Sequence, residues 1–273
     1  MLRSARGKVI GLLPAGGQAR RLSPLPMSKE LFPIGLARGR DNQYFPKVVS
    51  QYLLERMVTA GVGEAFVILR PGKWDIPAYF GDGTAVGMRL AYLTVHVSHG
   101  VPFTLDQAYP FVRGETVALG FPDILFWPEN AFEVVLGRLH ANDADVVLGL
   151  FPTDEPEKVG VVDVDEDGRV RGVYEKSGLT HLPYMWAIAV WGPRFTEFLH
   201  ASTDSAMHSS TPENVVAQGL NGGKAVAEIP IGNVIQAAVE SGQRIEAEIF
   251  SDGRYIDIGT PDNLAKAIRA GLP

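Results

Sequence analysis

Residues 9–34 of the chain read VIGLLPAGGQARRLSPLPMSKELFPI. The segment starts with an apolar run, Val9–Leu13, that is long enough for one buried strand, and then enters a loop of small residues that contains Gly16 and Gly17. Two arginines and a lysine follow. Glycines let the backbone approach a ligand closely and direct its N–H groups toward it, and arginine and lysine supply the charge that a polyphosphate needs. A strand that leads into such a loop predicts a phosphate site at the carboxyl end of a parallel strand.

This loop matches neither of the two commonest glycine fingerprints for phosphate binding. It lacks the Gly-Lys-Ser/Thr ending of the P-loop, and it lacks the third spaced glycine that precedes a helix in the dinucleotide-binding pattern. Taken alone, the loop is equally well interpreted as a turn whose basic residues are solvated, because glycine loops are common.

The whole segment resembles the signature of the sugar-1-phosphate nucleotidylyltransferases, which is G-G-x-G-T-R-L-x-P followed by P-K-x-L-x-P. Arg21 and Lys29 stand at the spacing of that signature. The other matching residues are Gly16, Gly17, Leu22, Pro24, Leu31 and Pro33. The departures are Ala19 for the third glycine, Arg20 for the threonine and Ser28 for the proline before the lysine.

The resemblance extends over residues 9–268 and implies both a fold and a reaction. The fold is a Rossmann-like three-layer α/β/α arrangement with a mostly parallel central sheet. We expect a single nucleotidyltransferase domain over residues 1–273, with residues 1–8 as a loose N-terminal tail. The reaction joins a nucleoside triphosphate to a sugar-1-phosphate and releases pyrophosphate.

Composition agrees with such an enzyme and excludes several other classes. The chain has 273 residues, 46% of them hydrophobic, no cysteine and a formal net charge of −6. The absence of cysteine excludes a disulfide framework, a thiolate metal site and a cysteine nucleophile, and an acidic balance argues against nucleic acid as a partner. No apolar run approaches the roughly 18–20 residues of a membrane span, so we expect a cytoplasmic protein without a membrane partner.

Apolar periodicity predicts alternating strands and helices. Helical spacing over residues 47–58, ending at Gly61, lies between the first strand and a second buried strand at 65–69. This order predicts a right-handed parallel crossover. Residues 159–170 predict a hairpin with its turn at Asp167-Gly168.

Later segments complete the expected arrangement. We expect Thr104 to cap the start of a helix, and the polar segment 202–214 to form a flexible loop. Further strands are expected at 116–126, 145–150 and 185–191, and further helices at about 131–140, at 232–240 and after Thr260.

Two aspartates are the candidate metal ligands. Asp123 interrupts an apolar strand sequence, and on its own it is more often a turn or cap residue. Asp257 lies in GRYIDIGTPDNL, residues 253–264, where the plain interpretation is a helix cap at Thr260 with Pro261 in the first turn. The resemblance equates Asp123 with the aspartate of L-G-D or L-P-D-V-I, and Asp257 with that of W-x-D-x-G-T-P-x-x-L. It therefore implies that both hold Mg²⁺.

The resemblance also implies where the nucleotide binds. Ala15, Gly16 and Gly17 would contact the nucleotide through the glycine loop. Residues 104–108, TLDQA, are similar to the G-L-A-Q-A segment, whose first glycine lies against the base. Thr104 replaces that glycine, Gln107 follows it, and His96 aligns with a glutamine that reads the base edge. A smaller space above the base favours a pyrimidine, so we expect dTTP or UTP as the donor.

The remaining implied residues bind the sugar phosphate. Gly160 would lie beside the sugar, and Glu175-Lys176 resembles the E-E-K-P segment. Glu175 would bind a sugar hydroxyl and Lys176 the phosphate, with glucose-1-phosphate as the expected acceptor. Trp186 is bulky where the related T-G-L-Y-x-F strand has small residues.

The resemblance also implies the catalytic roles, which match the charge that such a reaction must offset. Arg21 would neutralise the departing pyrophosphate and Lys29 would span the reacting phosphates. Two alternatives stay open, namely a catalytically silent regulatory homologue that binds nucleotide-sugars, and cytidylyl transfer to a non-sugar phosphate such as phosphocholine. The resemblance also implies a possible homo-oligomer.

Overall fold

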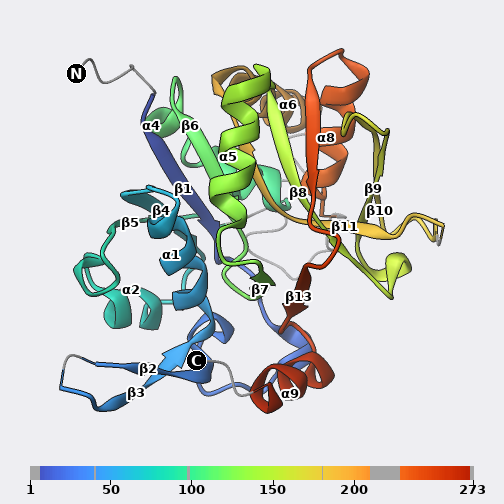
Figure 1. Ribbon diagram of the computed structural model, residues 1–273. Coiled ribbons are helices and arrows are strands. Elements are labelled where there is room, and N and C mark those ends of the chain that lie inside the picture. The colour runs from blue at the N-terminus through green and yellow to red at the C-terminus, as the bar shows by residue number, and fades with distance from the viewer. Residues whose placement is uncertain (1–6, 40, 97–98, 180, 210–227, 271–273) are drawn as a thin grey trace, which may run out of the picture.

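The computed structural model describes residues 7–39, 41–96, 99–179, 181–209 and 228–270. At the centre of this described part is a nine-stranded sheet. Seven of its strands are neighbours in the order β10-β9-β11-β6-β1-β4-β5, β8 pairs with β11, and β12 pairs with β8. Helices lie on both sides of the sheet (Figure 1).

Strand β1, Val9–Pro14, lies in the middle of the parallel half of the sheet. It pairs in parallel with β4, Glu64–Leu69, on one side and with β6, Thr116–Gly120, on the other. β5, Arg89–Thr94, continues the parallel arrangement beyond β4. The carboxyl ends of these strands therefore share one edge of the sheet, which is where open α/β sheets bind ligands.

The other half of the sheet is mixed. β11, Tyr184–Trp191, runs antiparallel to β6 and to β8, Val146–Pro152, and β12, Ile245–Ile249, pairs in parallel with β8. β9, Gly160–Val164, and β10, Val170–Glu175, form the predicted antiparallel hairpin. This half brings Gly160 and Glu175 opposite each other in the register.

Two apolar clusters cover the two faces of the sheet, because successive side chains of a strand point to opposite faces. Leu13 of β1 packs with α1, Val49–Thr59, and α5, Ala131–Asn142, whereas Leu12 packs into the second cluster. The helices of that second cluster are α3, Val101–Asp106, α4, Tyr109–Val112, α6, Pro193–Ser209, and α8, Ile231–Glu240. The predicted three-layer α/β/α fold is thereby confirmed.

Helix α1 packs directly against Gly120 of β6, where there is no room for a side chain. A Cβ at this position would lie 2.4 Å from Cδ1 of Leu53, which is fully buried. The predicted helix at 47–58 starts two residues later than expected, at Val49, because Tyr44–Val48 pairs as β3.

Two small sheets lie outside the central one. β2, Pro33–Arg38, pairs with β3 as an antiparallel hairpin, and β7, Ile124–Trp127, pairs antiparallel with β13, Arg254–Asp257. Helix α9, Pro261–Arg269, follows Thr260, whose hydroxyl accepts a hydrogen bond from the backbone N–H of Asn263 at 3.3 Å, as a cap. The remaining short elements are α2, Asp75–Phe80, and 3₁₀ turns at Arg20–Leu22, Lys29–Leu31, Thr84–Val86 and Pro156–Lys158.

Two sequence expectations about these elements are wrong. The strand expected at 116–126 is two strands, β6 and β7, separated by a turn that contains Asp123. The loop expected at 202–214 is helical up to Ser209, because α6 is anchored by the buried side chains of Phe195 and Leu199. Residues 210–214 lie outside the described residues, as does most of the tail expected at 1–8. Within the described chain, no helix combines the length and the apolar character needed to cross a membrane.

Candidate active site

The glycine loop begins at the carboxyl end of β1, as predicted. Ala15 is almost fully buried, and its backbone N–H donates to the carbonyl of Ile68 at the end of β4, at 2.8 Å. This hydrogen bond ties the start of the loop to the neighbouring strand. Ala19 adopts φ 51° and ψ 32°, a left-handed conformation that glycine adopts without strain. Ala19 therefore holds, where the related signature has glycine, a conformation that suits glycine.

Lys29 and Asp123 form an ion pair next to this loop. Lys29 opens the 3₁₀ turn that follows the loop, and Asp123 lies between β6 and β7. Each side chain is only 15% exposed. Burial acts to lower the pKa of Lys29, but the charge and hydrogen bond of Asp123 outweigh it and raise this pKa above its ordinary value. Lys29 is therefore cationic at physiological pH.

Asp257 joins this pair through the β7–β13 sheet. The register places Asp257 opposite Ile124, and the N–H of Ile258 donates to the carbonyl of Asp123 at 3.0 Å. Burial first, and then the charge of Asp123, raise the pKa of Asp257, whereas Lys29 and other cations act against that rise. The two predicted metal ligands thus lie near one another although they are far apart in the sequence.

Arg21 lies on the other side of Asp257. A Cβ placed on Gly259 would lie 2.8 Å from Oδ1 of Asp257 and 3.0 Å from Nη2 of Arg21, so both groups meet at this glycine. The N–H of Gly259 also donates to Oδ1 of Asp257 at 2.7 Å. Four charged residues predicted from sequence therefore come together here, as Arg21, Lys29, Asp123 and Asp257.

The chemistry of this cluster suits a hard divalent cation. Mg²⁺ is typically held by one or two carboxylates together with substrate phosphates and waters, and Asp123 and Asp257 offer two adjacent carboxylates. Among the residues that the structure describes, no group of three or more His, Cys, Asp or Glu side chains could hold a metal. A cation held by these two carboxylates would take its other ligands from water or from substrate oxygens.

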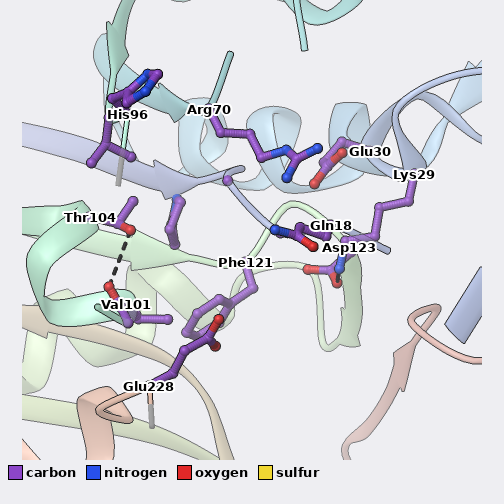
Figure 2. A pocket seen from close by; sticks show the side chains of 15 residues that line it. Gln18, Lys29, Glu30, Arg70, His96, Val101, Thr104, Phe121, Asp123 and Glu228 are labelled. Atoms are coloured by element: carbon purple, nitrogen blue, oxygen red, sulfur yellow. Dashed lines mark hydrogen bonds and ion pairs between the residues drawn. The ribbon is translucent and has the colours of Figure 1, made fainter. Parts of the chain in front are cut away.

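A cavity of about 300 Å³ opens beside the cluster. Figure 2 shows Lys29, Glu30 and Asp123 at one end, His96 with Thr104 at the other, and Glu228 near Phe121. The predicted residues that line it are Gly16, Gly17, Lys29, His96, Thr104 and Asp123. The sequence analysis missed the lining residues Pro14, Gln18, Glu30, Arg70, Val95, Gly100, Val101, Phe121 and Glu228.

Thr104 borders the cavity but does not cap a helix. Helix α3 starts at Val101, after Gly100, and the hydroxyl of Thr104 donates to the carbonyl of Gly100 at 3.2 Å, one turn back. Gly100 has φ 127°, and a Cβ there would lie 2.2 Å from the carbonyl oxygen of Ile229. The residue just before the helix is therefore a glycine, the residue type that tolerates this close approach, and Thr104 is buried within the helix.

Gln107 lies away from the cavity that the predicted nucleotide-binding residues His96 and Thr104 line. Val101 and Thr104 share the face of α3 that borders the cavity, whereas Phe103 and Gln107, four residues apart, share another face. Gln107 is exposed, its amide donates to the carbonyl of Phe103 at 3.4 Å, and it lines a separate hollow next to α6.

The predicted sugar residues form a second group. Glu175, at the end of β10, accepts hydrogen bonds from the side chain of Trp186 and the backbone N–H of Gly232, while burial raises its pKa. A Cβ on Gly160 would lie 2.7 Å from the Glu175 carboxylate and 2.9 Å from Nε1 of Trp186. Lys176 follows with φ 48° and an exposed side chain, and it does not line the cavity.

An aromatic contact links this group to the cavity. The ring of Phe121, which lines the cavity, lies 5.8 Å from that of Trp186, centre to centre. Sequence reasoning identified Trp186 only as a bulky departure. Its role as a donor to Glu175 depends on the pairing of β9, β10 and β11, which no local signal reveals.

A second ion pair near the glycine loop is buried. Glu30 is 2% exposed, and Nζ of Lys73 lies 2.6 and 2.7 Å from its two carboxylate oxygens. Burial raises the pKa of Glu30, and the Lys73 ammonium opposes this rise. The pair connects the residue next to Lys29 to the segment after β4.

Comparison with known proteins assigns the family. The family model described as nucleotidyl transferase matches residues 10–272, and the chain belongs to that family. It is 24% identical over 262 residues to Agl11, a low-salt glycan biosynthesis nucleotidyltransferase of Haloferax volcanii, covering 94% of this chain and 64% of that protein. It is 29% identical over 177 residues to a glucose-1-phosphate thymidylyltransferase of Actinoplanes sp., covering 64% of this chain and 54% of that protein. The chain thus spans less than two thirds of these relatives.

Solved structures bear out the fold. A UDP-glucose pyrophosphorylase complexed with UDP-glucose superposes with a TM-score of 0.74 at 18% identity, covering 96% of this chain and 98% of that one. Because the sequence identity is this low, the structural similarity establishes the architecture alone.

Proposed function

We propose that the protein is a sugar-1-phosphate nucleotidylyltransferase, which converts a nucleoside triphosphate and a sugar-1-phosphate into a nucleotide-sugar and pyrophosphate. The observation that carries this proposal is the convergence of Arg21, Lys29, Asp123 and Asp257 beside the glycine loop. These residues come from separate parts of the chain, yet they meet at the ligand-binding edge of the sheet.

The chemistry requires positioning and charge compensation rather than a protein nucleophile. An oxygen of the sugar phosphate attacks the α-phosphorus, and the bond from that phosphorus to the bridging oxygen breaks. The electron pair of that bond leaves with the pyrophosphate. Lys29, held cationic by its surroundings, offsets charge on the reacting phosphates. Arg21 stabilises the pyrophosphate as it leaves.

Asp123 and Asp257 would hold Mg²⁺ in this proposal. Such an ion supplies positive charge to the triphosphate oxygens. Without it the two carboxylates would repel a polyphosphate, and their mutual repulsion already contributes to the raised pKa of Asp257. The two carboxylates equal the cations Arg21 and Lys29 in number, so a bound Mg²⁺ would supply the net positive charge that a polyphosphate needs.

The finer assignments belong to the same proposal. The base would lie between His96 and Thr104, where the buried threonine narrows the cavity, and this favours dTTP or UTP. Glucose-1-phosphate is the favoured acceptor, with Gly160, Glu175 and Lys176 on its side of the site. A cytoplasmic location agrees with such substrates and with a chain that has no cysteine.

Pyrophosphate release tests the proposal. Purified protein is incubated with each of dTTP, UTP, CTP, ATP and GTP, and with glucose-1-phosphate, mannose-1-phosphate or phosphocholine, with Mg²⁺ or with EDTA. We expect release only with a sugar-1-phosphate and the cation, and at least a hundredfold less from Asp123→Asn. Nucleotide-sugar binding without any release would indicate the silent regulatory homologue, and release with phosphocholine would indicate the other alternative.

A further inference from the structure

Arg70 occupies a position at the site that none of the sequence motifs covers. It is the first residue after β4, the parallel neighbour of β1, so it reaches the same sheet edge as the glycine loop. Its side chain is half-buried and lines the 300 Å³ cavity. In Figure 2 its guanidinium points toward the space between Gln18, Glu30 and Lys29.

A second hollow, of about 430 Å³, adjoins the first along the glycine loop. The two hollows share Gly17, Gln18, Lys29 and Arg70. His96 and Thr104 line only the first hollow. Lys29 and Arg70 therefore stand between the end assigned to the base and the second hollow.

The cations that line these hollows differ in whether a carboxylate already pairs with them. Lys29 is paired with Asp123, and Lys73 is paired with Glu30. Within the described part of the chain, the side chain of Arg70 makes no ion pair, and its Nε is buried without a hydrogen-bond partner. A buried donor left unsatisfied costs free energy until a ligand satisfies it.

A carboxylate that lines the second hollow already accepts hydrogen bonds from a neighbouring residue. Asp75 accepts hydrogen bonds from the backbone N–H and the hydroxyl of Ser28, at 2.6 and 2.7 Å. It therefore does not compete for Arg70. The guanidinium presents a planar fork of donors that suits two phosphate oxygens at once.

We propose that Arg70 binds the terminal phosphates of the nucleoside triphosphate, which become the pyrophosphate product. These phosphates would lie in the second hollow, along the glycine loop. This inference rests on the proposed function. The sugar residues Glu175 and Lys176 line neither hollow, so Arg70 acts on the triphosphate and not on the acceptor.

Steady-state kinetics of the reverse reaction isolate this contact. In that direction pyrophosphate and the nucleotide-sugar are separate substrates, so each has its own KM. We expect Arg70→Gln to raise the KM for pyrophosphate about ten- to a hundredfold, as loss of a charge-assisted hydrogen bond does, and to leave the KM for the nucleotide-sugar within about twofold. Arg70→Lys retains the positive charge but not the planar guanidinium, and its KM for pyrophosphate should lie between those of the wild type and Arg70→Gln.

Arg89→Gln is the matched control. It makes the same change in charge at an 81% exposed residue on β5 that pairs with Glu64, at the opposite end of the strands. We expect it to leave both KM values at the wild-type level. Calorimetric titration with inorganic pyrophosphate and Mg²⁺ provides a second readout that does not need turnover, and Arg70→Gln should weaken binding by the same factor.

The outcomes separate the inference from the proposed function. An unchanged KM and affinity for pyrophosphate in Arg70→Gln, with active wild-type enzyme, overturns the role of Arg70 alone. An inactive wild-type protein overturns the proposed function, and the calorimetric comparison then still decides whether Arg70 binds pyrophosphate. If Arg70→Gln does not fold, Arg70→Lys decides, and wild-type affinity for pyrophosphate in that variant counts against the fork contact.

Discussion

Replacing Lys73 by methionine should destabilise the protein more than removing the charge of any exposed residue. Lys73 and Glu30 are 9% and 2% exposed, and two short hydrogen bonds join them. Lys73→Met keeps an unbranched apolar stem and leaves the Glu30 carboxylate buried without its counter-ion. Breaking a buried pair from one side costs about 3–5 kcal/mol, which is a large part of the roughly 5–15 kcal/mol that stabilises a typical domain.

The pH dependence gives this prediction a distinctive signature. Burial already raises the pKa of Glu30 with Lys73 present, so removing the ammonium raises it further. A carboxyl with a folded-state pKa above its unfolded value favours folding below the unfolded pKa, and this contribution is lost as the pH rises through the folded pKa. The deficit of Lys73→Met relative to the wild type should therefore be largest at neutral pH and smaller at about pH 5.

Urea unfolding followed by tryptophan fluorescence measures both effects. The double variant Glu30→Gln/Lys73→Met removes the unpaired charge and should recover at least about half of the lost stability. Lys158→Met is the matched control, because Lys158 and its partner Glu155 are exposed, and its unfolding midpoint should equal that of the wild type. A cost below about 1 kcal/mol for Lys73→Met at neutral pH, as for a surface pair, or a deficit that does not shrink in acid, would refute the reasoning.

Three further predictions concern activity. Asp123→Asn should stay folded but lower turnover by about two orders of magnitude, and near wild-type turnover in a folded variant would remove the metal assignment. Lys29→Ala should reduce mainly kcat, whereas Lys176→Ala should raise mainly the KM for the sugar phosphate, because only Lys29 would touch the group being transferred; steady-state kinetics showing the reverse pattern would exchange their roles. Thr104→Gly should widen acceptance of purine nucleotides by restoring space near the base, as competition binding across five triphosphates would measure; a preference for ATP or GTP that is unchanged in this variant would show that the base lies elsewhere.

The amino-acid sequence determined the features that depend on local pattern. The apolar run at Val9–Leu13 and the glycines after it predict β1 and its loop, and the loop does lie at the carboxyl edge of a parallel strand. The alternation of strands and helices predicts the three layers, because hydrophobic periodicity records which face of each element is buried. The matched signature also identified Lys29 and Asp123, which the structure joins as an ion pair.

How distant segments meet could be seen only in the folded chain. The pairing of β7 with β13 places Asp257 beside Asp123, and no local pattern contains that register. The start of α3 at Val101 turned Gln107 away from the cavity, since a shift in the first helical residue changes which side chains share a face. Arg70 follows an ordinary buried strand, and what distinguishes it among the described residues of the site is a buried side-chain Nε without a hydrogen-bond partner. Whether a charge is paired is set by three-dimensional packing, which joins residues far apart in sequence, and not by the neighbours of that residue along the chain.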